Sequence, residues 1–231
     1  MQICFFEDTE VPHLLPLVRT RPIYDLRLGQ RTMLERLVDA LDAEDPILHV
    51  REDLTQVTAA EHPGRTVNPH EIARADAAAS PGDLLLINGR LAPADPAAVT
   101  SIREAADAGE HVRLLDGDTL VAARIPRDRF SEIRGTLLDR DTFSDLPERT
   151  VESPPRIARL WDLIDGLPDR LTEDLDRLLR DRGPQVPEQA IRRSGGAVVA
   201  PNRIHCDSSA TLKPGVILNA ENGPIVIDRD A

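Results

Sequence analysis

The run of aliphatic residues Leu84–Ile87 constrains the fold of this chain more than any other stretch. Turn-forming pairs bound it on both sides, Pro81-Gly82 before it and Asn88-Gly89 after it. A strand that lacks polar alternation has both of its faces covered, which is the environment of a central strand in a parallel sheet. The sequence therefore predicts a buried strand here, inside a sheet of the α/β class.

Strand and helix patterns alternate along the first half of the chain. The expected strands are Gln2–Phe6, Pro46–Val50, Leu84–Ile87, His111–Leu115 and Thr119–Ile125, and the expected helices are Thr32–Leu41 and a stretch from Asp95 or Pro96 to Ala108. This alternation predicts an α/β fold with a mainly parallel sheet.

The middle of the chain is charged and shows apolar residues at helical spacing. Helices are expected within Arg127–Leu138, Ile157–Ile164 and Leu171–Leu179. Trp161 is expected to pack as a core anchor, because a large aromatic ring gains most from burial.

Composition argues against several classes of binding partner and several cellular locations. The 231 residues contain 40 acids and 28 bases, for a net charge of −12, whereas broad binding to nucleic acid or to an anionic membrane needs a basic surface. Neither a signal peptide nor an apolar run of membrane-spanning length is present, so we expect a cytoplasmic protein. The distant Cys4 and Cys206 are expected as buried reduced thiols, and no cluster of metal ligands is visible.

The stretch Leu14–Leu41 reads as a loop that leads from the first strand into an amphipathic helix. Its arginines reverse the acidic sign of the chain locally: Arg19, Arg21, Arg27 and Arg31. Guanidinium groups suit phosphate and carboxylate ligands. In an open parallel sheet, the loop after the first strand often forms the floor of the ligand-binding crevice. Two interpretations stay open here, namely an anion site and simple pairing with the many surface acids.

The same stretch resembles a known family. The pattern PL-x-x-x-RP, x-x-x-L-x-x-G and MLERLVDAL is similar to the opening of sugar-1-phosphate nucleotidyltransferases, and in particular to a divergent branch related to bifunctional N-acetylglucosamine-1-phosphate uridyltransferase/glucosamine-1-phosphate acetyltransferase. The resemblance implies a Rossmann-like domain that binds a nucleotide and a sugar phosphate, with Arg19, Arg21 and Arg27 on the phosphates and Gly29 allowing close approach. FEDTEVPH replaces the family's glycine-rich loop, and Ile23 stands where its lysine belongs.

The turn Asn88-Gly89-Arg90 is the second place where the resemblance bears on chemistry. In the family a corresponding strand ends in a Gly-Asp pair whose carboxylate holds a divalent cation, and here Arg90 stands in the position of that Asp. Arginine repels a cation and cannot coordinate it. We expect either a plain turn or a phosphate site built from Asn88, Gly89 and Arg90, with Mg²⁺ as a cofactor only if the site is catalytic; no catalytic residue can be named.

The last part of the chain follows a different pattern. Ile204, Ala210 and Val216 recur at a six-residue spacing, which predicts the coils of a parallel β-helix. It resembles left-handed hexapeptide β-helix acyltransferases, which implies a homotrimer for a full-length protein. The expected domains are a nucleotidyltransferase-like domain at 1–182, a linker at 183–196 and the truncated start of a β-helix at 197–231. His205 is expected on the surface.

Three interpretations of function follow. The first is a strongly divergent sugar-1-phosphate nucleotidyltransferase, which would join a nucleoside triphosphate and a sugar phosphate. The second is a non-catalytic binding or assembly module on the same fold. The third is the N-terminal fragment of a hexapeptide-repeat acyltransferase.

Overall fold

The computed structural model describes residues 1–69, 82–92, 99, 102–104, 109–152 and 156–231. The chain divides into two compact units, the first formed by Met1–Arg27 and Arg31–Leu163 and the second by Leu28–Gln30 and Ile164–Ala231. This division differs from the expected one, because the second unit already begins at Ile164 and the expected linker contains a helix. Most of the expected helix at 95–108 lies outside the described residues.

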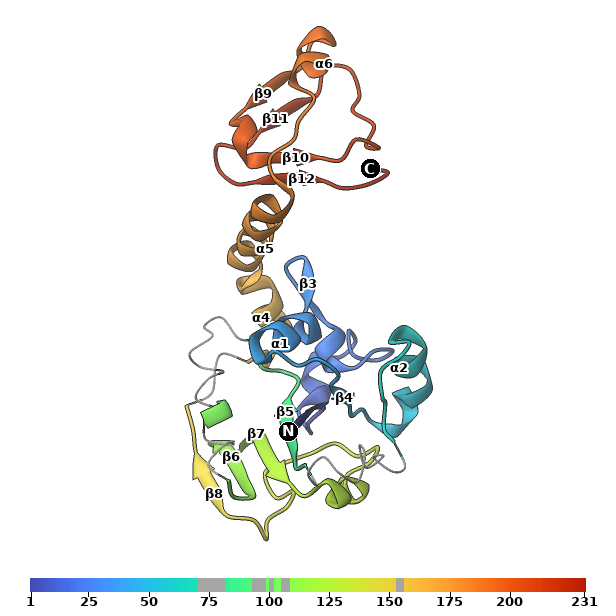
Figure 1. Cartoon of the computed structure of the whole chain (residues 1–231), viewed down its shortest axis with the longest axis vertical. Helices are drawn as coiled ribbons and strands as arrows, with labels where there is room; N and C mark the ends of the chain where they lie inside the picture. The colour runs from blue at the N-terminus through green and yellow to red at the C-terminus, as the bar shows by residue number, and fades with distance from the viewer. Residues whose placement is uncertain (70–81, 93–98, 100–101, 105–108, 153–155) are drawn as a thin grey trace. The chain divides into compact units, whose positions relative to one another are not determined.

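The first unit contains one main sheet and several short helices (Figure 1). Its strands are β1 (Gln2–Phe6), β4 (Ile47–Leu48), β5 (Leu84–Asn88), β6 (Val112–Asp116), β7 (Thr119–Ile125) and β8 (Glu148–Thr150), with a small ribbon of β2 (Arg27–Leu28) and β3 (Arg31–Thr32). Its helices are α1 (Met33–Leu41), α2 (Thr55–Glu61) and α4 (Leu160–Asp165), the last of which runs across the division between the units, and its 3-10 turns are Val11–Leu14, Ile23–Asp25, Glu52–Leu54 and Arg127–Glu132.

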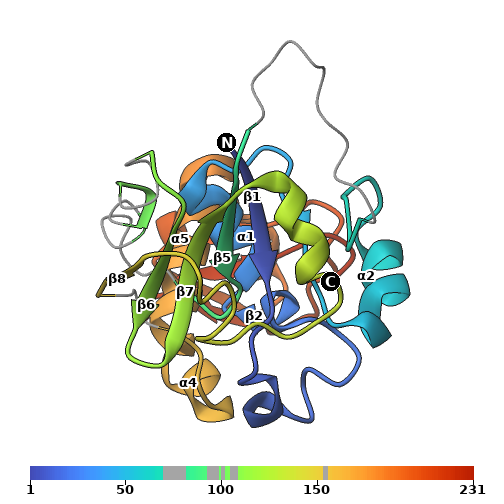
Figure 2. The ribbon, with the colours of Figure 1, turned by 90° about the horizontal axis from the view of Figure 1, so that it is seen from below.

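The main sheet has the strand order β4-β1-β5-β7-β6-β8, and neighbouring strands lie side by side in Figure 2. β1 is parallel to both β4 and β5, and β8 is parallel to β6, whereas β7 is antiparallel to both of its neighbours. The prediction of a mixed α/β fold with a mainly parallel sheet is confirmed. So is the buried strand at Leu84–Ile87, where all four side chains are at most 1% exposed.

Helix α1 forms where the amphipathic pattern predicted it. Thr32 and Glu35 close a capping box: the Thr32 hydroxyl accepts from the Glu35 amide (3.1 Å), and the Glu35 carboxylate accepts from the Thr32 amide (2.7 Å). Met33, Leu34, Leu37 and Leu41 are buried, so the apolar stripe of the helix packs into the core of the unit.

Two expectations for the middle of the chain were wrong. The stretch 127–138 forms only the 3-10 turn Arg127–Glu132, from which Phe130 enters the core. Trp161 is not a core anchor, since 59% of its surface is exposed. Its helix α4 has only six residues and buries none of them, so the spacing of apolar residues there does not mark a buried face.

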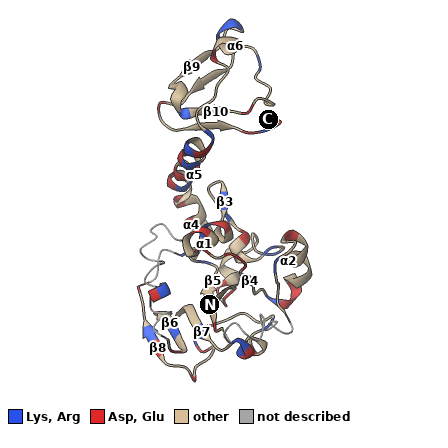
Figure 3. Cartoon of the chain, viewed as in Figure 1, with Lys and Arg blue, Asp and Glu red and all other residues tan. Residues whose placement is uncertain are grey.

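The second unit holds α5 (Leu167–Arg182), α6 (Glu188–Arg193), the turn Pro201–Arg203 and four short strands, β9 (Ala197–Val199), β10 (Ile204–Cys206), β11 (Ile217–Asn219) and β12 (Ile225–Ile227). β9 pairs in parallel with β11, and β10 pairs in parallel with β12. Ile225 pairs with Ile204 and Ile217 pairs with Ala197, and buried side chains from these strands form a separate small core. Acidic and basic residues share the surface of α5 (Figure 3).

His205 is buried rather than on the surface, with 5% exposed. Its Nδ1 lies 2.9 Å from the carbonyl oxygen of Gly183, and His205 also forms a parallel β-bridge with Gln185. The segment that contains Gly183 and Gln185 therefore contacts and helps to cover this side chain.

Both cysteines are free and buried, as predicted. Burial raises the pKa of the Cys4 thiol, so the thiolate form is disfavoured. None of the described helices combines the length and the apolar character needed to cross a membrane.

Candidate functional site

The site is built where the direction of the chain across the sheet reverses. From β1 the chain passes through α1 to β4 on one side, and it then crosses to β5 on the other side of β1. The carboxyl ends of β1 and β5 thus flank a topological switch point, which is where open α/β sheets bind ligands. Glu7 and Asp8 directly follow β1, and Asn88 ends β5.

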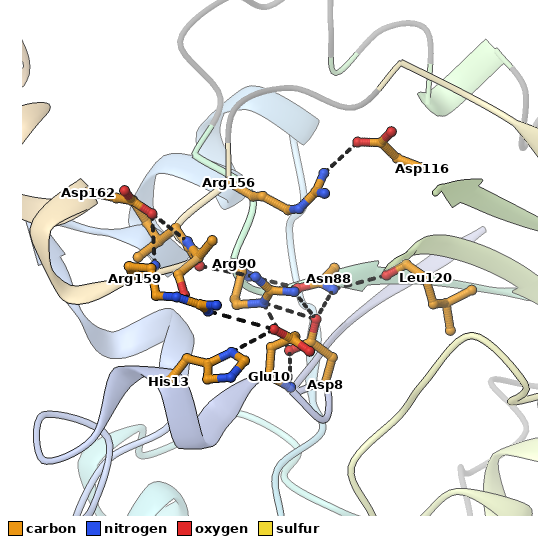
Figure 4. Close-up of polar contacts among 12 residues, drawn as sticks. Asp8, Glu10, His13, Asn88, Arg90, Asp116, Leu120, Arg156, Arg159 and Asp162 are labelled. Atoms are coloured by element: carbon orange, nitrogen blue, oxygen red, sulfur yellow. Dashed lines mark hydrogen bonds and ion pairs between the residues drawn. The ribbon is translucent and has the colours of Figure 1, made fainter. Parts of the chain in front are cut away.

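Asp8 and Arg90 fill this switch point with a buried ion pair (Figure 4). Arg90 Nη2 lies 2.6 Å from Asp8 Oδ2, and its Nε lies 2.9 Å from both carboxylate oxygens. Arg90 is 2% exposed and Asp8 is 3% exposed. Asn88 completes the network, because its Nδ2 donates to Asp8 (2.7 Å) and to the carbonyl of Leu120 (2.9 Å), while its Oδ1 accepts from the amide of Arg90.

This geometry corrects the expected role of Arg90. Its remaining Nη1 donates to the carbonyl of Ile157 (3.2 Å), so the guanidinium is used by the protein itself and does not present a face to a phosphate. The donor set also does not fit a divalent cation, since both oxygens of Asp8 accept hydrogen bonds from a guanidinium. Within the described residues there is no group of three or more His, Cys, Asp or Glu side chains that could hold a metal ion.

Gly89 is required by packing rather than by a ligand. A Cβ atom at this position would lie 2.9 Å from Cδ1 of Tyr24 and 3.1 Å from the carbonyl oxygen of Phe6. Tyr24 is fully buried, and its hydroxyl lies 3.4 Å from the carbonyl of His49. The first loop therefore places an aromatic ring against the turn at which we expected a phosphate.

Glu7 forms an ion pair with Arg51, which follows β4, the other neighbour of β1 in the sheet. Its carboxylate accepts from Nη1 of Arg51 (2.5 Å), from the Arg51 amide (3.1 Å) and from the amide of Ile23 (3.0 Å). Arg51 also donates through Nη2 to the carbonyl of Val18. Burial raises the pKa of Glu7, and the nearby Arg51 charge opposes that rise.

The four arginines of the first loop differ in exposure. Arg19, Arg21 and Arg27 are exposed, whereas Arg31 pairs with Asp39 at 2.8 Å, as the simple pairing interpretation predicted. Gly29 has a φ of 83° in the turn between β2 and β3, a conformation that favours glycine. Gly29 belongs to the second unit, whereas Arg19, Arg21 and Arg27 belong to the first.

Asp25 ties this loop to the end of helix α2. Nε2 of His62 lies 2.9 and 3.0 Å from the two oxygens of Asp25. Burial raises the pKa of Asp25, and the contacts with His62 and the charge of Arg21 oppose the rise. Arg21 is thus held near an acid without a direct ion pair.

Glu10 carries a second, exposed set of charges at this edge of the sheet (Figure 4). His13 lies 2.7 Å from its carboxylate and Arg159 lies 4.0 Å from it. Asp162 accepts from the backbone amides of Ala158 and Arg159 and so fixes the segment that carries Arg159. These contacts place the guanidinium of Arg159 and the imidazole of His13 beside Glu10.

An open hollow of about 590 Å³ lies next to the carboxyl end of β4. The turn before α2, the helix itself, the segment after it and the segment after the turn Arg127–Glu132 line the hollow. The lining residues are Glu52, Asp53, Thr55, Gln56, Val57, Val67, Asn68, Pro69 and Arg134. Asn68 is buried and uses both ends of its amide on the backbone of Val50, so it shapes the wall.

Sequence reasoning missed Glu7, Asp8 and Arg51. A signal was present, because two consecutive acids directly after a strand of buried aliphatic and aromatic residues need cationic partners if the strand end is covered. The partners lie after β4 and β5, and only the sheet order shows which arginine meets which acid.

The chain is similar to one family of known proteins and to several solved structures. The family described as "Sugar nucleotidyl transferase" matches residues 3–183, which is more than half of the chain. No curated protein sequence matched it. Among solved structures, Rv0371c from Mycobacterium tuberculosis H37Rv is similar at 19% identity, covering 73% of this chain and 98% of that chain, with a TM-score of 0.44.

Two further solved structures are similar to the chain. One is described as a "Putative Glucose-1-Phosphate Thymidylyltransferase" from Bacillus anthracis in complex with sucrose, at 12% identity, covering 74% of this chain and 95% of that chain, with a TM-score of 0.47. The other is the Rv0371c homologue from Mycobacterium sp. strain JC1, at 14% identity, covering 77% of this chain and 100% of that chain, with a TM-score of 0.41.

Proposed function

The chain belongs to the sugar nucleotidyl transferase family, and from this membership we propose that it binds a nucleoside triphosphate and a sugar 1-phosphate and forms a nucleotide sugar. One observation supports the place of binding. The exposed Arg19 and Arg21 are carried by the loop that leaves the carboxyl end of β1, beside the switch point of the sheet. Guanidinium groups at such an edge match the charge and the hydrogen-bonding geometry of phosphate oxygens.

The proposed chemistry rests on charge neutralisation and positioning. Nucleotidyl transfer develops negative charge on phosphate oxygens, and fixed cations near those oxygens lower its barrier. Arg19, Arg21 and Arg27, which all belong to the first unit, are the proposed phosphate contacts. Mg²⁺ would be brought by the nucleotide, because the buried acids of this site do not fit it.

A non-catalytic binding module is the second candidate, and the Asp8–Arg90 pair favours it. The acid that follows β1 is neutralised by a buried guanidinium, and Tyr24 packs over Gly89, so the protein fills the crevice where phosphates would react. On this alternative the exposed arginines still bind the anionic ligand, but no pyrophosphate is released.

For the second unit we propose the start of a left-handed hexapeptide β-helix, supported by the parallel pairing of β9 with β11 and of β10 with β12. Such coils assemble homotrimers in the acyltransferases that the sequence resembles. Acyl transfer is therefore proposed only for a longer protein that contains this chain.

The experiment that tests the proposed function follows pyrophosphate release and ligand binding together. The purified chain is incubated with Mg²⁺, each nucleoside triphosphate in turn and a panel of hexose 1-phosphates, and binding is measured separately by calorimetry. Release that is lost in Arg21→Ala and kept in Arg193→Ala supports the enzyme, because Arg193 is an equally exposed arginine on α6. Binding without release supports the module, and absence of both contradicts the proposal.

A further inference from the structure

The segment Val18–Ile23, which we call the arginine arch, is attached at both ends to one ion pair, formed by the buried Glu7 and the partly buried Arg51. At its start, the carbonyl of Val18 accepts from Nη2 of Arg51. At its end, the amide of Ile23 donates to Oε1 of Glu7 at 3.0 Å. Arg51 and Glu7 are themselves joined at 2.5 Å. The arch and the pair thus form a closed loop of contacts inside the first unit.

The arch presents its arginines because its ends are buried. Val18 and Ile23 are 0% exposed, whereas Arg19, Thr20 and Arg21 between them are all exposed. The side chains on which a phosphate would bind therefore belong to a short span with two buried ends, one of which donates a hydrogen bond to Glu7, itself 0% exposed. A buried carboxylate keeps its partners, because losing them leaves an uncompensated charge in the interior.

We propose that the Glu7–Arg51 pair is the positioning device of the anion site, holding the arginine arch so that Arg19 and Arg21 face one ligand together. The inference rests on the proposed function, and it assigns the two residues no contact with the ligand. Preorganisation is its physical basis, since a ligand that finds both guanidiniums already oriented does not have to order a flexible loop.

Arg51→Lys is the variant that separates positioning from stability. Lysine keeps a positive charge beside Glu7, but its single ammonium group cannot take the place of a guanidinium that bonds the carboxylate and the Val18 carbonyl at once. Arg113→Lys is the matched control, because Arg113, which is more deeply buried than Arg51, also joins a carboxylate, that of Glu148, to a backbone carbonyl, that of Arg140. Among the described residues, its hydrogen bonds do not involve the arch.

Trypsin gives a readout of the arch that needs no ligand. The protease cuts after arginine but not before proline, so Arg19-Thr20 is open to cleavage in the arch and Arg21-Pro22 is not. In Arg51→Lys the initial rate at which the peptide Met1–Arg19 appears should rise by about tenfold or more, the effect of losing one hydrogen bond from a charged group. In Arg113→Lys that rate should stay at the wild-type value.

Calorimetric titration with inorganic pyrophosphate gives the second readout. We expect the affinity of Arg51→Lys to fall by about tenfold, for the same lost hydrogen bond, and that of Arg113→Lys to be unchanged. Glu7→Gln provides an independent variant. The amide oxygen of the new glutamine can still accept from the Ile23 amide, but the negative charge that attracts Arg51 is gone. It should move both readouts in the same direction as Arg51→Lys.

The outcomes distinguish this inference from the proposed function. Faster cleavage with weaker pyrophosphate binding supports the inference. Unchanged cleavage after Arg19 in a folded Arg51→Lys overturns it, and so does faster cleavage with unchanged binding. If the wild-type chain binds neither pyrophosphate nor any nucleotide, the proposed function fails, while the cleavage rates still decide whether the pair holds the arch.

Discussion

Asp8 and Arg90 lie at the carboxyl ends of two neighbouring parallel strands and join them through hydrogen bonds as short as 2.6 Å. Both side chains are almost completely buried, so each charge depends on the other for the solvation that it lost on folding. The ion pair therefore links the carboxyl ends of β1 and β5, and we expect it to contribute to the stability of the first unit.

Replacing Asp8 with Asn should destabilise the chain by about 3–5 kcal/mol, the typical cost of leaving one member of a buried ion pair without its partner. Urea unfolding followed by circular dichroism measures the change. The double variant Asp8→Leu/Arg90→Met should recover much of the loss, because it leaves no buried charge unpaired. A double variant as unstable as Asp8→Asn would show that the network matters for more than the pair.

Replacing Gly89 with Ala should cost about 1–3 kcal/mol, because the new methyl group meets Tyr24 and the Phe6 carbonyl at distances that force a neighbour to move. The melting temperature of the variant gives the measurement. Gly223→Ala is the control, since a Cβ there meets nothing within 4 Å and the residue has no positive φ. Equal melting temperatures for both variants would contradict the steric argument.

Removing the cap of α1 should weaken that helix. In Thr32→Ala the Glu35 amide loses its acceptor, and the expected loss is about 1 kcal/mol of unfolding free energy. Thr32→Ser keeps the hydroxyl and should retain most of the stability. If Ser and Ala were equally destabilising at this position, the methyl group rather than the cap would be responsible.

Stability should decrease in mild acid because of His49. Burial lowers the pKa of this side chain to about 4, against about 6.5 for an unfolded chain, so folding favours the neutral ring. Its contribution to the free energy of unfolding is therefore complete above about pH 6.5 and is lost as the pH falls toward 4. Urea unfolding at pH 7.5 and pH 5 should show the difference.

The variant His49→Phe isolates this contribution to the pH dependence. Burial raises the pKa of Glu7 and Asp25, so their cost to stability decreases as the pH falls and they act in the opposite sense to His49. We expect His49→Phe to lose less stability than the wild type between pH 7.5 and pH 5. If the two proteins lose the same stability between these pH values, the assignment to His49 is wrong.

Periodicity predicted those elements whose side chains are buried in a regular pattern. Leu84–Ile87 and Thr119–Ile125 are strands, and Thr32 caps the helix that ends at Leu41, because backbone geometry and burial agree in these segments. The same reasoning failed at Trp161, where apolar spacing occurs in a helix too short to bury a face. It also failed at His205, because the segment that contains Gly183 and Gln185 contacts this side chain.

The candidate site was predictable only in outline. The exposed Arg19 and Arg21 could be placed on the first loop from the sequence, and their role in binding stays a prediction. Arg90 could not be assigned, because its partner Asp8 is distant in sequence and the resemblance suggested a ligand instead. Pairings across a sheet depend on strand order, and strand order is set by tertiary packing that no local pattern encodes.

Glu7 and Asp8 are adjacent in the sequence, yet one serves the strand on each side of β1, through Arg51 and Arg90 respectively. A slip of β1 by one residue would put one acid in the place of the other and would bring Phe6 opposite Arg51 or Thr9 opposite Arg90, depending on its direction. Either slip would leave one arginine without its acid, so the two ion pairs together specify the alignment of β1. Insertions and deletions should accordingly be tolerated far less between Gln2 and Asp8 than in any surface loop of the chain.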